Sequence, residues 1–142
     1  MKRLILAALT ALATLPAAAG EKPDLVTVLT APDPQTQLMS MVLTMQSMKQ
    51  GSAAHVLLCG PAGDLALKEA PAAATAPQKP KGMSPQGLMQ KIMAQGAEVE
   101  VCAIYLPNKG VGAEALLDGI GVAKPPAMAA RLIAPNARVM SF

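Results

Sequence analysis

Apolar residues along the chain fall into short continuous runs separated by longer stretches with helical spacing. The short runs are rich in β-branched residues and fit buried strands over residues 25–30, 54–59, 99–105, 120–122 and 138–142. Between them, apolar residues recur every three or four positions, which predicts helices over residues 34–50, 84–95 and 125–133. Shorter helices are expected over residues 64–70 and 113–117.

Capping residues mark the two longest predicted helices. Asp33 can cap the first, with Pro34 at its first position, and a glycine at position 51 ends it. Ser84 and Pro85 begin the second, and a glycine at position 96 ends it. Strands alternating with helices imply right-handed crossovers. The expected fold class is therefore α/β, a three-layer α/β/α sandwich with a parallel sheet of about five strands.

The first 19 residues have the order of a secretory signal peptide. Lys2 and Arg3 precede an apolar run over residues 4–15, and small residues at 17–19 suit cleavage. The run is shorter than the roughly 20 residues that a membrane-spanning helix needs. We expect an exported, periplasmic protein that leaves the membrane after cleavage. Its mature part, residues 20–142, is one domain with a Pro/Ala-rich surface loop at 71–82.

Charge and aromatic content exclude one class of function. Loss of Lys2 and Arg3 lowers the formal net charge from +3 to +1. No cluster of basic residues remains, and Tyr105 and Phe142 are the only aromatic residues. Nucleic-acid binding, which needs a basic surface and usually stacking platforms, is not expected. The core must be built from aliphatic residues and from methionine, of which the chain has ten.

Two cysteines end neighbouring predicted strands. Cys59 ends the second strand and Cys102 lies late in the third, so both fall toward the carboxyl edge of the sheet, where parallel α/β folds place their chemistry. Three interpretations stay open: functional thiols, small buried packing residues, or a disulfide, which an oxidising compartment permits. If functional, a thiolate would need helix N-terminal N–H groups to stabilise it. The turn with Gly60, Gly63 and Asp64 offers at most a weak anion-binding site at a helix start.

Other candidate chemistry is weaker. His55, the single histidine, starts a strand about 13 Å from Cys59 and is expected to be structural. Met41, Met45 and Met48 could supply soft ligands for Cu(I), but their spacing equally fits a core-facing helix stripe. Glu98 and Glu100 are expected at a solvated edge. Dinucleotide, Walker and nucleophile-elbow motifs are absent, so no cofactor and no metal site is predicted.

Three segments carry a family resemblance: VLLCGPAGDLALKEA, SPQGLMQKIMAQGAEVEVCAIYLPN and ARVMSF. With the order of elements from residue 25 to 142, they resemble the DsrE/DsrF-like family, most closely its exported members of unassigned function. The resemblance implies an α/β/α sandwich, a trimer or hexamer, and a persulfide-carrying cysteine at Cys102.

Two main functional hypotheses follow. In the first, the protein is a sulfur carrier or thiol redox protein that acts through Cys102 on a small sulfur compound or a partner protein. Cys59 would then be a resolving or packing residue. In the second, it is a non-catalytic oligomeric binding module for a small anionic ligand or a protein partner. Cu(I) binding is a third, weaker hypothesis.

Overall fold

The sheet in a computed structural model, which describes residues 22–142, has five strands that are all parallel. In spatial order they are β4 (Gly121–Val122), β3 (Glu98–Val101), β2 (Ala54–Leu58), β1 (Asp24–Leu29) and β5 (Ala137–Ser141). The chain adds strands in one direction from β1 to β4 and then returns to place β5 beside β1. The predicted fold class is confirmed.

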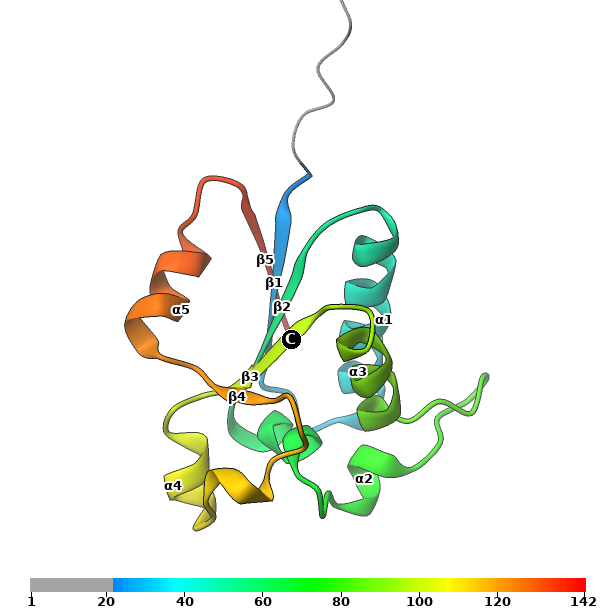
Figure 1. Ribbon diagram of the computed structural model, residues 1–142. Helices are drawn as coiled ribbons and strands as arrows, with labels where there is room; N and C mark the ends of the chain where they lie inside the picture. The colour runs from blue at the N-terminus through cyan, green and yellow to red at the C-terminus, as the bar shows by residue number, and fades with distance from the viewer. Residues whose placement is uncertain (1–21) are drawn as a thin grey trace, which may run out of the picture.

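Helices cover both faces of the sheet (Figure 1). One face carries α1 (Pro34–Lys49), α3 (Pro85–Met93), the 3-10 helix η1 (Gly60–Ala66) and the short α2 (Ala72–Thr75). The other face is covered by α5 (Pro125–Leu132), whose Met128 packs on Val26 and Leu57. The remaining short helices, α4 (Tyr105–Lys109) and η2 (Ala113–Ala115), belong to the connection that joins β3 to β4 along the chain.

The predicted helix starts are correct in their details. Asp33 caps α1 by accepting a hydrogen bond from the Thr36 N–H at 2.8 Å, and Ser84 caps α3 by accepting from the Gly87 N–H at 3.1 Å. The turn after each helix ends at a glycine with a positive φ angle, Gly51 after α1 and Gly96 after α3. These contacts span three residues, so the local sequence alone determines them.

Four predicted elements differ from the structure in extent or type. The third strand ends at Val101, and the expected strand residue Tyr105 begins α4 instead. The helix expected at 64–70 is a 3-10 helix that starts four residues earlier, and the one expected at 113–117 is a three-residue 3-10 turn. The expected surface loop at 71–82 contains α2, whose Ala74 is buried. Alanine favours helix strongly enough to form this turn between prolines.

The main core lies between the sheet and the α1/α3 layer. It is made almost entirely of aliphatic side chains and methionines; its fully buried members include Leu29, Met41, Leu58, Leu65, Met89, Ile92 and Val101. Met45 and Met48 pack against the same cluster. Met41, Met45 and Met48 therefore form the core-facing stripe that their spacing allowed. No described helix is both long and apolar enough to cross a membrane.

Candidate functional site at the carboxyl ends of the strands

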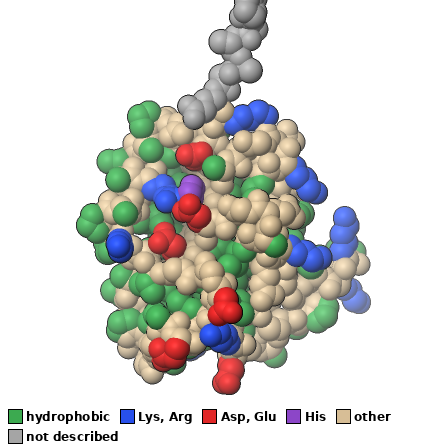
Figure 2. Space-filling view, viewed as in Figure 1, with side chains coloured by type: hydrophobic (Ala, Val, Ile, Leu, Met, Phe, Trp, Pro, Cys, Tyr) green, Lys and Arg blue, Asp and Glu red, His purple; other side chains and the backbone are tan. Residues whose placement is uncertain are grey.

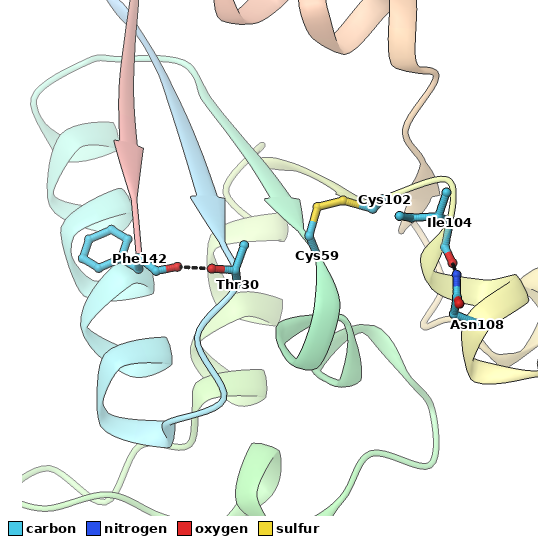
Figure 3. The surroundings of a disulfide bond; sticks show 6 residues. All are labelled: Thr30, Cys59, Cys102, Ile104, Asn108 and Phe142. Atoms are coloured by element: carbon cyan, nitrogen blue, oxygen red, sulfur yellow. Dashed lines mark hydrogen bonds between the residues drawn. A yellow bond between two sulfur atoms is a disulfide. The ribbon is translucent and has the colours of Figure 1, made fainter.

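Cys59 and Cys102 form a disulfide at the carboxyl edge of the sheet (Figure 3). They follow Leu58 and Val101, the last register pair of β2 and β3, so they stand directly opposite each other. The Cys59 N–H donates to the Leu29 carbonyl at 2.9 Å, and the Cys102 N–H donates to the Leu58 carbonyl at 2.8 Å. These bonds continue the sheet ladder by one step and hold the two Cα atoms 5.2 Å apart, within the range that a disulfide requires.

Of the three interpretations left open for the cysteines, the structure selects the disulfide, and residues 22–142 contain no free cysteine. Both cysteines are half-buried, and both contact the cluster beneath α5. Each precedes a short helix: Cys59 is the N-cap of η1, and Cys102 lies two residues before Ile104, the N-cap of α4. The bond is therefore at the edge of the core, beside two turns.

A polar cluster adjoins these turns. Asp64 Oδ1 accepts a hydrogen bond from the Tyr105 hydroxyl at 2.6 Å and another from Lys109 Nζ at 2.7 Å. Burial of the phenol is the main cause that raises the pKa of Tyr105, and the hydrogen bond to the Asp64 carboxylate and its negative charge add to the effect. The cluster joins η1 to α4 across 41 and 45 residues of sequence.

An open cavity of about 520 Å³ lies over this cluster. Seven residues of η1 and α4 and their flanks line it: Gly60, Pro61, Asp64, Ile104, Tyr105, Asn108 and Lys109. Ile104 is 72% exposed and gives the cavity an apolar wall. Its charged groups, Asp64 and Lys109, are paired with each other. The cavity therefore offers a concave surface beside the disulfide turns rather than an unpaired charge.

The residues of the predicted anion site are not equivalent. Gly60 and Asp64 line the cavity, and Gly60 has a φ of +54°, which allows the sharp turn after Cys59. Gly63 is buried, and a Cβ at this position would clash with the ring of Tyr105. Glycine is thus required at position 63, because only a residue without a side chain allows η1 to approach α4 so closely. The Asp64 carboxylate already accepts two hydrogen bonds from side chains.

His55 lies at the opposite end of the sheet, as expected. Its Nδ1 is 3.0 Å from Glu98 Oε2, which also accepts from Arg131 Nη1 at 2.9 Å. This cluster, visible around the purple histidine in Figure 2, fastens α5 to the starts of β2 and β3. Glu98 is thus an exposed but paired residue. Within residues 22–142, no group of three or more His, Cys, Asp or Glu side chains could hold a metal ion.

The apolar pattern of the sequence does not predict that α4 contributes to this site. The apolar pattern predicts a strand that ends at Tyr105 and no element at Lys109, yet both side chains contact Asp64. A local signal was present, because Gly110 follows Lys109 and can adopt the left-handed conformation that ends helices; its φ is 74°. The continuous apolar run before it outweighed that signal.

The Tyr105–Asp64 hydrogen bond predicts a pH effect on stability. Because the pKa of Tyr105 is higher in the folded state, the bond contributes fully below the unfolded value of about 10 and is lost as the pH rises toward the folded pKa. Tyr105→Phe should lower the free energy of unfolding by about 1.5 kcal/mol at neutral pH. The difference from wild type should shrink above about pH 10. Urea unfolding of both proteins from pH 7 upward would measure it; a difference independent of pH contradicts the assignment.

Comparison with known proteins supports the fold and leaves the family open. No family profile and no curated protein matches the sequence. Among solved structures, the ychN protein from E. coli superposes with a TM-score of 0.67 at 20% identity, covering 84% of this chain and 99% of its own. MTH1491 from Methanobacterium thermoautotrophicum, a protein of unknown function, gives 0.61 at 10% identity, covering 86% and 100%. At these identities, the likeness shows a common fold.

Proposed function

We propose that this chain is an exported DsrE/DsrF-like protein that performs sulfur transfer or thiol–disulfide exchange through Cys59 and Cys102. The observation that carries the proposal is the joining of these two cysteines at the carboxyl edge of a parallel sheet, beside an open cavity. The fold shared with the ychN protein and MTH1491 supports the family resemblance.

The disulfide also supports export. Stable disulfides belong to oxidising compartments such as the periplasm. The signal peptide assigned to residues 1–19 lies outside the described residues, so the support comes from the mature domain. A homo-oligomer, a trimer or hexamer, is part of the same proposal. It is supported by apolar side chains exposed outside the main core, including Ile104 at 72% and Ile133 at 83%.

The chemistry requires only the disulfide and a sulfur nucleophile. Hydrosulfide attacks Cys102 Sγ, a bond forms between the two sulfurs, and the bond to Cys59 breaks, leaving its electron pair on Cys59 as a thiolate. Cys102 then carries a persulfide. An acceptor thiolate takes the outer sulfur and leaves both cysteines reduced. Alternatively, Cys59 attacks Cys102 Sγ, restores the disulfide and releases hydrosulfide. A small thiol in place of hydrosulfide gives disulfide exchange by the same steps.

The cavity favours one alternative function, that of a non-catalytic binding module. Its volume of about 520 Å³ is in the usual range for small-molecule sites. In this case the disulfide would brace β2 against β3, and a ligand or partner would contact the surface around Gly60 and Ile104. The reactivity of the disulfide distinguishes the two functions.

The test combines a redox titration with sulfur uptake by the mature protein. A functional pair should have a reduction potential between about −120 and −270 mV, the range of thiol-exchange proteins. Oxidised protein treated with hydrosulfide should gain one sulfide by intact mass and release thiocyanate on cyanolysis. In Cys59→Ser, a sulfane donor should load Cys102, whereas Cys102→Ser should take up no sulfur.

Wild-type protein that is reduced and then alkylated at both cysteines is the matched control and should not react. A potential below about −300 mV, typical of structural disulfides, together with no sulfur uptake, would exclude the proposed function and leave the binding module.

A further inference from the structure

Helix α1 buries three polar side chains beside Met41 and leaves two large apolar side chains exposed on its outer side. Its Gln37, Ser40 and Thr44 are buried against the sheet, where the Thr44 hydroxyl lies 2.8 Å from that of Thr27. On its outer side, Met39 is 52% exposed and Leu43 is 40% exposed. A surface helix normally places polar residues outward. Met39 and Leu43 lie one turn apart, so they form an exposed apolar patch, which is typical of a binding surface.

Met39 lies at a groove of about 450 Å³ between α1, α3 and the segment before α3, and the floor of this groove reaches the edge of the main core. Met39, Val42 and Met45 line it from α1, and Met83 and Leu88 line it from the start of α3 and the segment before it. That segment is held as a strap, because Gln78 and Met83 form an isolated antiparallel bridge and the Gly82 N–H donates to the Gln78 carbonyl. Methionine side chains adapt readily to apolar ligands. None of these residues lines the cavity beside the disulfide.

The strap brings positive charge to the groove. Lys79 and Lys81 both line it, and no Asp or Glu does. Within the described residues neither ammonium group takes part in an ion pair. A second copy of the chain placed symmetrically on this groove would oppose lysines to lysines. The complementary ligand therefore has an apolar body and a negative head.

We propose that the groove binds a single-chain amphiphile with one carboxylate head group, such as a fatty acid. The acyl chain contacts the methionines and Val42, and the carboxylate pairs with Lys79 and Lys81. The site goes beyond the proposed thiol function and shares no residue with it, so either can fail without the other.

The test uses methyl NMR of the mature, oxidised protein labelled at methionine methyl groups. Dodecanoate, kept below its micelle concentration, should shift the signals of Met39, Met45 and Met83 saturably. Met93 and Met128, which do not line the groove, should not shift. Affinity should rise about fourfold per methylene from octanoate to dodecanoate, and dodecyltrimethylammonium should bind at least tenfold more weakly.

Exposed lysines provide variants that should fold normally. The double variant Lys79→Gln/Lys81→Gln should weaken dodecanoate binding at least tenfold, whereas Lys91→Gln, an exposed lysine of α3 outside the groove, should leave it unchanged. Equal binding of the cationic amphiphile, or equal shifts at Met128, would overturn the proposal. So would groove signals that change with protein concentration alone, which would mark an interface between copies. Binding of an acidic amphipathic peptide without dodecanoate would assign the groove to a protein partner instead.

Discussion

Replacing both cysteines by alanine is expected to lower the free energy of unfolding by about 2–4 kcal/mol. The disulfide closes a loop with a sequence separation of 43 residues, and breaking it restores conformational freedom to the unfolded chain. Urea unfolding followed by circular dichroism would measure this loss of stability.

Reduced wild type is the control for this experiment. It should unfold at the same urea concentration as Cys59→Ala/Cys102→Ala, and reductant should not affect the double variant. By linkage, the disulfide in the folded protein should be harder to reduce than in the unfolded chain by about 40–90 mV. Equal stability of the oxidised protein and the double variant would show that the bond does not constrain the domain.

Ile92→Ala is expected to destabilise the protein by about 2–5 kcal/mol. Ile92 is fully buried in the main core, in the helix α3 that packs on α1, and truncation leaves a cavity that rigid neighbours only partly fill. The effect should appear as a lower urea midpoint with an unchanged slope.

Ile133→Ala is the matched control, because it removes the same atoms from a side chain that is 83% exposed. Its effect in the isolated domain should stay within about 0.5 kcal/mol of zero. Similar losses from both substitutions would contradict the assignment of the core to the α1/α3 side.

The sequence predicted part of the candidate site at the carboxyl ends of the strands. It placed Cys59 and Cys102 correctly at the carboxyl edge of the sheet, because each cysteine follows a strand that the apolar pattern predicts and parallel strands end at one edge. It left the pairing open, since that depends on which strands are neighbours and on their register. The sequence did not predict the hydrogen-bond partners of Asp64 for a similar reason. Tyr105 and Lys109 become neighbours of Asp64 only when α4 folds against η1.

By itself the sequence determined the α/β class, the order of the main strands and helices, and the caps at Asp33 and Ser84. These features depend on contacts within a few residues or on the spacing of apolar positions. Only the tertiary structure decided the disulfide, the helix α4 and the burial of polar side chains of α1 beside Met41. Thr44 is buried because Thr27 of β1 lies 2.8 Å from its hydroxyl. The Thr44 hydroxyl also donates to the Ser40 carbonyl one turn earlier, but the contact with Thr27 spans 17 residues, and no local pattern records such a pairing.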